Sequence, residues 1–256
     1  DAQSLQDGLD DSTEELEFTV VDVRDAFKLI PAHPAERRFL AALFAGWILV
    51  AYSLVFGLAS APLVWGRFAA FLGRSAQAVA GCATSAREAP ARARLQIYVD
   101  DPILTIAGAP AARTRLLAVV LWWWIALGVP LSWAKAQRGS RVGWIGAHLQ
   151  ASAGRVTISV PEEKARAIGT AARDIRALNL VSRQRLRQLA GVGAWASGLC
   201  RALAPFVRQL WGAVSSERRR SDGRVWTKQV ARALRWMETL LLGQQAGVAL
   251  RRTIKP

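Results

Sequence analysis

The chain has 256 residues, of which 52% are hydrophobic, so it is long enough to bury one sizeable core or two smaller ones. Its formal net charge of +15 is unevenly distributed. Residues 1–25 hold nine of the nineteen acidic side chains and one Arg, while the rest of the chain has 33 Lys and Arg against 10 Asp and Glu. This surplus favours a polyanionic partner, either nucleic acid or an acidic membrane surface, although a genome rich in Arg and Ala codons is an alternative explanation.

The cysteines and histidines exclude several kinds of site. Cys82 and Cys200 have no Cys or His at ligand spacing, which argues against a zinc site or a disulfide framework and favours an intracellular protein, cytoplasmic or nuclear. His33 and His148 lie in no pattern typical of Ser-His or Cys-His catalysis. The sequence has no G-x-x-x-x-G-K phosphate loop, and its acidic start is unlike a signal peptide.

Two uncharged stretches make a basic membrane protein an alternative hypothesis. Residues 39–66 and 116–134 carry no charge, and each is long enough to cross a bilayer as a helix. The first stretch is interrupted by glycine and proline, however, and residues 39–56 fit two short apolar strands that turn near Ala45 and Gly46. We therefore expect no membrane span.

Up to residue 160, short strands and helices alternate, and this order favours an α/β or α+β domain after an acidic lead-in over residues 1–17. Apolar and β-branched runs predict strands, and longer apolar segments bounded by Pro and Gly predict helices. We expect strands over residues 18–23, 95–99, 103–106, 141–149 and 155–160, and helices over residues 63–72 and 111–127.

The remainder of the chain has a helical and basic pattern. Pro161 and the two glutamates after it form a good helix start, and Ser182 can cap the next helix. The Arg-rich run over residues 183–187 is either a solvated face or a contact to a nucleic-acid backbone. We expect domains over residues 18–150 and 151–214, followed by a basic loop and final helix over residues 215–256.

Three aspartates stand at the ends of expected strands. Asp22 ends the first one, and Asp100 and Asp101 lie in the turn of a hairpin. Carboxylates at such tips are hard oxygen ligands of the kind that Mg²⁺ prefers, and a pair of bound divalent ions can activate a hydroxyl and hold a triphosphate. Most Asp-Asp pairs are solvated turns, so the residues alone leave both interpretations open.

Short motifs around these aspartates resemble, in their order along the chain, the palm motifs of retroelement reverse transcriptases. Residues 160–164 and 234–237 resemble the segment after the palm in tyrosine-recombinase retrotransposons. The resemblance implies an α+β polymerase palm over residues 18–150, followed by a mainly helical thumb or connection region, with most of the fingers missing. The motifs are residues 20–27 (VVDVRDAF), 56–62 (FGLASAP), 98–101 (YVDD), 127–128 (LG) with Lys135, and 144–146 (WIG).

The resemblance implies an RNA-directed DNA polymerase of a mobile element. Its cofactors would be two Mg²⁺ ions, with Mn²⁺ as an alternative, and its partners an RNA or DNA template with primer and deoxynucleoside triphosphates. Phe27 would lie under the sugar and select deoxynucleotides, and Lys135 would act on the leaving pyrophosphate. The implied catalytic and metal-binding residues are Asp22, Asp100 and Asp101; the nucleotide-binding residues are Arg24, Asp25, Ala26, Phe27, Gly57, Pro62 and Lys135; the primer grip is Trp144, Ile145 and Gly146.

The chain departs from the family's pattern at two points. Only 21 residues precede Asp22, which is why we expect the fingers to be missing. Pro102 cannot donate a backbone hydrogen bond in the strand that leaves the Asp-Asp turn, so we expect local distortion there. These departures keep open the alternative of a catalytically inactive, nucleic-acid-binding remnant of such a polymerase.

Overall fold

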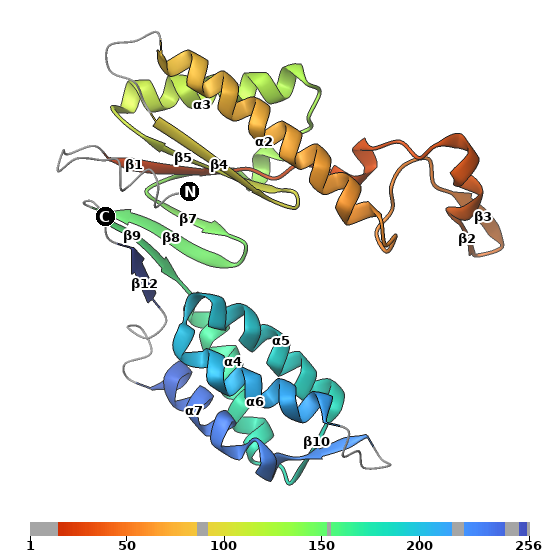
Figure 1. Cartoon of the computed structure of the whole chain (residues 1–256), viewed down its shortest axis with the longest axis vertical. Helices are drawn as coiled ribbons and strands as arrows, with labels where there is room; N and C mark the ends of the chain where they lie inside the picture. The colour runs from red at the N-terminus through yellow and green to blue at the C-terminus, as the bar shows by residue number, and fades with distance from the viewer. Residues whose placement is uncertain (1–14, 86–91, 153–154, 217–222, 244–250, 255–256) are drawn as a thin grey trace. The chain divides into compact units, whose positions relative to one another are not determined.

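The structure is a computed structural model that describes residues 15–85, 92–152, 155–216, 223–243 and 251–254 (Figure 1). Most of the expected acidic lead-in, residues 1–14, lies outside the described residues. The chain divides into two compact units, of which the first holds residues 1–145 and 150–156 and the second holds residues 146–149 and 157–254. Each unit is described by itself.

A four-stranded antiparallel sheet forms the centre of the first unit, with the strand order β4-β5-β1-β6. All side chains of β5 after Asp101 are buried, on both faces of the sheet, which matches the continuous apolar run of this strand. The strands are β1 (Leu16–Val20), β4 (Arg92–Tyr98), β5 (Asp101–Ala107) and β6 (Gln137–Gly139).

Helices α2 (Ala61–Ser85) and α3 (Pro110–Ala126) pack together on one face of this sheet (Figure 1). Trp65 and Leu72 of α2 are almost fully buried in the shared core. Trp124 of α3 is also buried, and its indole donates to the Leu72 carbonyl at 3.4 Å. Trp122 points outward and is exposed, so the three consecutive tryptophans serve both core and surface.

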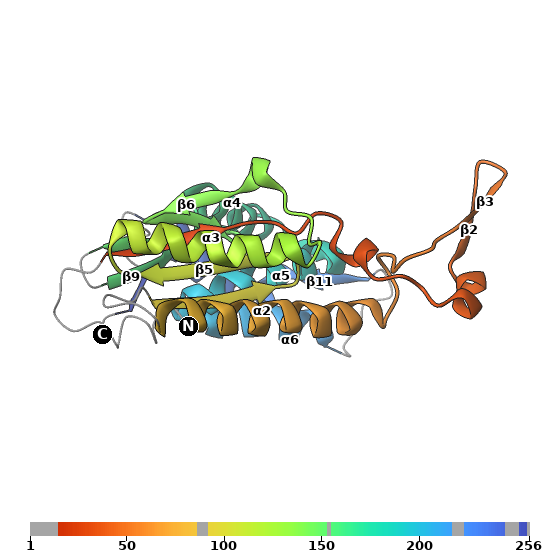
Figure 2. The same ribbon diagram turned by 90° about the horizontal axis from the view of Figure 1, so that it is seen from above.

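The expected hairpin over residues 39–56 is confirmed as β2 (Ala41–Phe44) paired with β3 (Trp47–Val50). Ala45 and Gly46 form the turn, with φ values of 48° and 83°, as two-residue hairpin turns require. The hairpin extends away from the sheet (Figure 2), and the side chains of both strands are exposed. No helix in the described part of the chain is long and apolar enough to cross a membrane, so the membrane hypothesis gains no support.

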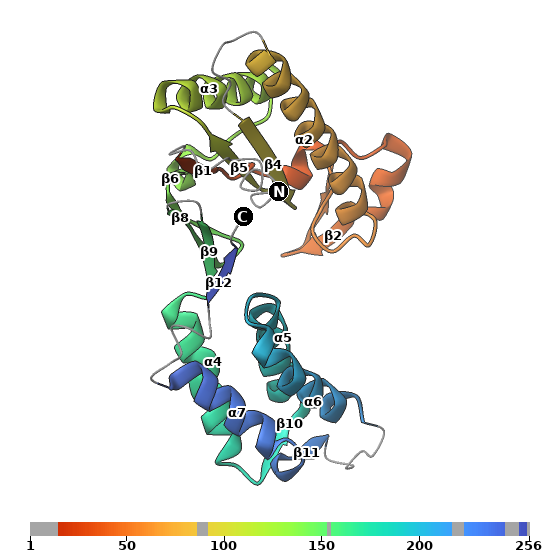
Figure 3. The ribbon, with the colours of Figure 1, turned by 60° about the vertical axis from the view of Figure 1, so that its left-hand side comes forward.

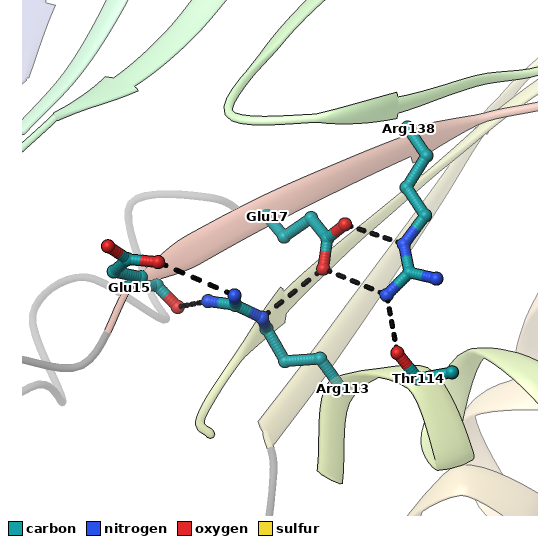
Figure 4. A network of polar contacts seen from close by, with 5 residues as sticks. All are labelled: Glu15, Glu17, Arg113, Thr114 and Arg138. Atoms are coloured by element: carbon teal, nitrogen blue, oxygen red, sulfur yellow. Dashed lines mark hydrogen bonds and ion pairs between the residues drawn. The ribbon is translucent and has the colours of Figure 1, made fainter. Parts of the chain in front are cut away.

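A network of charged side chains ties the start of β1 to α3 and β6 (Figure 4). Glu17 accepts hydrogen bonds from the Arg138 guanidinium at 2.5 and 3.2 Å, and its second oxygen lies 3.2 Å from Nε of the buried Arg113. Arg113 also donates to the backbone carbonyl of Glu15 at 2.6 Å, and Arg138 donates to the Thr114 hydroxyl at 2.7 Å. Glu17 is therefore the carboxylate that two guanidinium groups share.

The second unit is a bundle in which α4 packs beside α7 and α5 beside α6 (Figure 3). The predicted helical character of this region is confirmed, and Ser182 caps α5 as expected, because its hydroxyl accepts from the Arg185 amide at 3.2 Å. Leu186, Leu210 and Met237 are fully buried at its centre. The helices are α4 (Glu162–Arg176), α5 (Arg183–Leu199), α6 (Ala204–Ser215) and α7 (Ala231–Leu242).

The remaining elements are short. Two strands near α5 and α7 pair with each other, and a further sheet has the order β12-β9-β8-β7. The strands are β7 (Arg141–Trp144), β8 (Ala147–Ser152), β9 (Arg155–Ser159), β10 (Leu180–Ser182), β11 (Arg224–Trp226) and β12 (Arg251–Ile254), and the 3-10 helices are η1 (Ala26–Leu29), η2 (Pro34–Phe39), η3 (Trp133–Lys135), η4 (Arg201–Leu203) and η5 (Thr227–Gln229).

Several sequence-predicted boundaries were wrong. The first strand begins at Leu16, two residues earlier than expected, because Leu16 pairs with Ala107 of β5. The strand expected to begin at residue 95 begins at Arg92, since Arg92 also pairs with Ala107. The strand expected over residues 141–149 is interrupted by a turn at Ile145. Pairing between distant segments, which local pattern does not reveal, extends these strands.

Candidate functional site

The structure brings Asp22 and Asp101 together across neighbouring strands. The register of β1 and β5 pairs Val20 with Ile103, and beyond it the Val21 amide donates to the Pro102 carbonyl at 3.3 Å and the Val23 amide to the Asp100 carbonyl at 2.9 Å. Continued by two residues, this register sets Asp22 opposite Asp101. Residues at such a non-hydrogen-bonded position have Cα atoms about 4.5 Å apart and side chains on the same face of the sheet.

Asp100 lies in the two-residue turn between β4 and β5, while Asp101 is the first residue of β5. Val99, which precedes Asp100, has a φ of 56°, a left-handed conformation that is rare for a β-branched residue. The indole of Trp65 donates to the Val99 carbonyl at 2.6 Å, and the indole of Trp144 donates to the Asp101 carbonyl at 2.9 Å. Two tryptophans from separate elements therefore hold the turn that carries the acidic pair.

The distortion expected at Pro102 is absent. Pro102 keeps its place opposite Ile97 in an unbroken β4–β5 register. In an antiparallel ladder the N–H and C=O of one residue point to the same neighbouring strand. Because the Pro102 carbonyl accepts from Val21, the missing amide also faces the β1 side, where β1 ends at Val20. The proline therefore removes one bond at the end of a ladder and does not disturb the hairpin.

Lys135 brings a positive charge to the aspartates. Its ammonium lies 2.8 Å from Oδ2 of Asp22. The backbone supports this pair, because the Ser132 amide donates to the Asp22 carbonyl at 2.8 Å and the Lys135 amide donates to the Ser132 carbonyl at 3.2 Å. The segment before η3 thus runs beside Asp22, two residues after the end of β1, and places the lysine next to its carboxylate.

The electrostatics of the cluster reflect this crowding. Burial raises the pKa of the Asp101 carboxyl, and the negative charges of Asp100 and Asp22 raise that pKa further, while the Lys135 ammonium opposes them. The hydrogen bond and the charge of Asp22 raise the pKa of Lys135. The three carboxyl groups and the ammonium therefore lie within electrostatic reach of one another.

Of the expected nucleotide-binding residues that follow Asp22, two are exposed and two are buried. Arg24 and Asp25 are exposed, and Asp25, at a φ of 55°, forms a 2.6 Å ion pair with Lys28 that lowers the pKa of Asp25. Ala26 and Phe27 are buried in η1. The ring of Phe27 lies 5.0 Å from the ring of Phe56 and 6.0 Å from that of Trp65. Phe27 is thus part of the core next to the Asp100 turn.

Gly57 and Pro62 belong to the segment that leads into α2. Gly57 has a φ of 101°, which a residue with a side chain rarely adopts, and Pro62 occupies the first turn of the helix, as expected. Both residues are exposed. Trp65, three residues after Pro62, was not singled out in the sequence, because an apolar residue on a core helix has no distinctive pattern; it is the residue that joins this segment to the Asp100 turn.

Ile145 and Gly146 form the two-residue turn between β7 and β8, with φ values of 43° and 83°. The Gly146 carbonyl accepts a hydrogen bond from the Lys164 ammonium at 3.3 Å, and this ammonium also lies over the Trp195 ring. The φ of 83° favours glycine at residue 146, and a Cβ atom there would lie 2.3 Å from the Lys164 Nζ atom, so a larger residue would also have to displace this flexible side chain.

The expected metal ligands do not form a ready-made ion site. Among the described residues, no three His, Cys, Asp or Glu side chains lie close enough together to hold a metal ion. The cation that contacts Asp22 is the Lys135 ammonium. The Arg-rich run also differs from its expectation at one residue: Arg183 donates to the carbonyls of Val214 and Ser216 at the end of α6, while Arg185 and Arg187 are exposed.

Comparisons with known proteins support the fold. No protein-family model matches the sequence, and no curated protein is detectably similar to it. The foamy viral protease-reverse transcriptase in complex with an RNA/DNA hybrid aligns with 89% of this chain at a TM-score of 0.60 and 15% identity, and this chain covers 27% of it. A second structure of that protein, in complex with double-stranded DNA, aligns with 94% of this chain at a TM-score of 0.60 and 14% identity, with 37% of it covered.

These similarities show the fold. The mixture of helices and antiparallel sheet confirms the predicted α+β class, and the fold resembles that of a reverse transcriptase. The chain spans less than half the length of the structures that it matches.

Proposed function

We propose that this chain is the palm and the thumb or connection region of an RNA-directed DNA polymerase from a mobile element. The observation that carries the proposal is the placement of Asp22 opposite Asp101, next to the Asp100 turn, on a fold that resembles a reverse transcriptase. Like charges placed directly across a sheet destabilise it. A cluster of this kind is therefore more easily explained by a cationic ligand than by stability.

Asp22, Asp100 and Asp101 are proposed to hold two Mg²⁺ or Mn²⁺ ions. The chemistry of the donors fits, because carboxylate oxygens are hard ligands of the kind that these ions prefer. When bound, such ions activate the primer hydroxyl and neutralise charge on the triphosphate.

Other residues of the chain are proposed to position the substrates. The exposed backbone at Arg24 and Asp25 faces the triphosphate, and the buried ring of Phe27 supports the nucleotide sugar from below. Gly57 and Pro62 shape the nucleotide floor, the turn at residues 144–146 positions the primer end, and Lys135 neutralises the leaving pyrophosphate. Support for nucleic acid as the partner comes from the basic charge of the chain and from the RNA/DNA hybrid and DNA in the similar structures.

A nucleic-acid-binding remnant without activity is the second candidate. It is favoured by one observation, that no three potential ligands form a metal cluster within the described residues. Both candidates predict that an RNA/DNA hybrid binds and that affinity falls steeply with salt. They differ in whether the aspartates are needed for nucleotide addition.

Single-nucleotide primer extension on an RNA template, with Mg²⁺ or Mn²⁺, distinguishes the candidates. We expect Asp100→Asn to reduce incorporation by at least about 100-fold, because several kcal/mol of transition-state stabilisation depend on the metals. The matched control is Asp174→Asn, which changes an exposed carboxylate on α4 and should leave incorporation unchanged. Hybrid binding without any extension would favour the remnant, and extension that is insensitive to Asp100→Asn would refute the polymerase proposal.

A further inference from the structure

We propose that Lys135 is a displaceable cation, whose ammonium neutralises Asp22 in the metal-free chain and leaves Asp22 when a divalent ion binds. Lys135 thereby weakens the affinity of the site for the metal, because a divalent ion binds Asp22 only when the ammonium leaves it. This inference rests on the proposed function, because it takes the aspartates as metal ligands.

The geometry of the Lys135–Asp22 pair is the first argument. The distance of 2.8 Å between Nζ and Oδ2 is typical of a charge-assisted hydrogen bond. An ammonium at this distance occupies the Oδ2 atom, which a metal ion would also use. Two cations that share one carboxylate oxygen repel each other, so the lysine and a divalent ion compete for it.

The two partners differ in freedom, which decides which of them moves. The Asp22 side chain is 16% exposed, whereas the Lys135 side chain is 70% exposed. The backbone of Asp22 is fixed on both sides, because its carbonyl accepts from the Ser132 amide and the flanking amides of Val21 and Val23 donate to the β5 side. The lysine reaches the aspartate from solvent on a flexible four-carbon stem. Displacement therefore moves the ammonium and leaves the carboxylate in place.

The negative charge of the aspartate cluster is the third argument for this role of Lys135. Asp22 lies opposite Asp101, with Asp100 in the adjoining turn, so three carboxylates gather at one end of the sheet. Within the described part of the chain, the cation in contact with them is Lys135. Its ammonium offsets part of their repulsion before a metal arrives, and after displacement it stays tethered through η3 beside the site. The same residue is then free to act on a leaving group.

Titration of the whole chain with Mn²⁺ tests the inference, with free Mn²⁺ followed by electron paramagnetic resonance and no nucleic acid or nucleotide present. We expect Lys135→Met to tighten Mn²⁺ binding about two- to five-fold, the range that corresponds to the loss of one exposed ion pair. The matched control is Lys28→Met. Lys28 is 65% exposed and pairs with Asp25 at 2.6 Å, so this variant removes the same charge from a similar ion pair. It should leave the affinity unchanged.

A second readout follows the ammonium directly. Acetylation of Lys135 by a soluble acylating reagent, measured by mass spectrometry, should become faster when Mg²⁺ is added, while acetylation of Lys28 should not. Release from the hydrogen bond to Asp22 frees the Lys135 nitrogen for the reagent, which explains the direction of the change.

The outcomes separate this inference from the proposed function. Mn²⁺ binding that Asp22→Asn abolishes, but that is equally tight in the wild type and Lys135→Met, would overturn the inference and leave the metal site intact. Equal tightening by Lys28→Met and Lys135→Met would also overturn it, because the effect would then be one of total charge. If no variant binds Mn²⁺ in an Asp22-dependent way, the metal site of the proposed function fails as well.

Discussion

The indole of Trp65 donates a 2.6 Å hydrogen bond to the backbone carbonyl of Val99, and this bond joins helix α2 to the turn that carries Asp100. Val99 has a left-handed backbone conformation, which costs about 1–2 kcal/mol for a residue with a branched side chain. The turn is therefore held in a strained form by the surrounding structure, in which Trp65 is fully buried. A core residue of the helix thus determines the position of a candidate catalytic residue.

Replacing Trp65 by Phe should destabilise the chain by about 1–3 kcal/mol, because the hydrogen bond is lost and the smaller ring leaves unfilled volume. Urea denaturation measures this change. Trp122→Phe, the same substitution at an exposed position of α3, should change the free energy of unfolding by less than about 0.5 kcal/mol. Asp100-dependent primer extension should also fall in Trp65→Phe under conditions where the variant is fully folded. Unchanged extension would mean that Trp65 does not position the turn.

Asp101→Asn should stabilise the folded chain at neutral pH. The pKa of Asp101 is raised in the folded state by burial and by the negative charges of Asp100 and Asp22. The folded chain therefore binds the proton more tightly than the unfolded chain, and stability falls as the pH rises from the ordinary aspartate value of about 3.9 through the raised value. The gain from Asp101→Asn should be present at pH 7 and disappear near pH 3, as measured by urea denaturation at both values.

The neighbouring Asp25 provides a control of opposite sign. The hydrogen bond and charge of Lys28 lower the pKa of Asp25, so its carboxylate stabilises the fold above the ordinary aspartate value, and this stabilisation is lost as the pH falls through the lowered value. Asp25→Asn should therefore reduce stability at pH 7 and have little effect at low pH. Asn tolerates the left-handed conformation of this residue, so the backbone adds little to the change. Effects of equal sign at Asp25 and Asp101 would contradict the electrostatic account.

The exposed hairpin of β2 and β3 should accept charge without loss of stability. Leu43 is 77% exposed, so Leu43→Lys should change the free energy of unfolding by less than about 0.5 kcal/mol, raise solubility and reduce the fluorescence of a bound apolar dye. Leu72 on α2 is 2% exposed, and Leu72→Lys should prevent folding, because it buries an unpaired charge. A large stability loss in Leu43→Lys would show that the hairpin packs more tightly in solution than in this structure.

Glu17→Gln should destabilise the first unit by about 2–3 kcal/mol, because it leaves the buried Arg113 without its carboxylate partner on β1. The double variant Glu17→Gln, Arg113→Met should be less unstable than the single variant, since it also removes a buried charge whose remaining carboxylate partner is the exposed Glu15 at 3.5 Å. Glu162→Gln, which breaks an exposed 2.5 Å pair with Arg166, should cost less than about 1 kcal/mol. Thermal denaturation of these proteins and of the single variant Arg113→Met compares them, and losses that add up in the double variant would argue against coupling.

The local sequence pattern predicted those elements whose conformation depends on only a few adjacent residues. The turn at Ala45 and Gly46, the α3 helix closed by Gly128, and the cap at Ser182 were all predicted, because backbone conformation and capping depend on a few adjacent residues. The strand starts at Leu16 and Arg92 were missed, since both depend on pairing with Ala107 far along the chain. The prediction that Pro102 distorts the hairpin was wrong, because it did not take account of where β1 ends.

The sequence by itself determined which residues are candidates: three aspartates at strand ends and a lysine downstream. Only the tertiary structure decided their relations. It places Asp22 opposite Asp101 and the Lys135 ammonium next to the Asp22 carboxylate. It also places the Trp65 indole where it donates a hydrogen bond to the turn that carries Asp100. The physical reason is that these contacts join residues far apart in the sequence, and their geometry follows from strand register and core packing, which no single segment specifies.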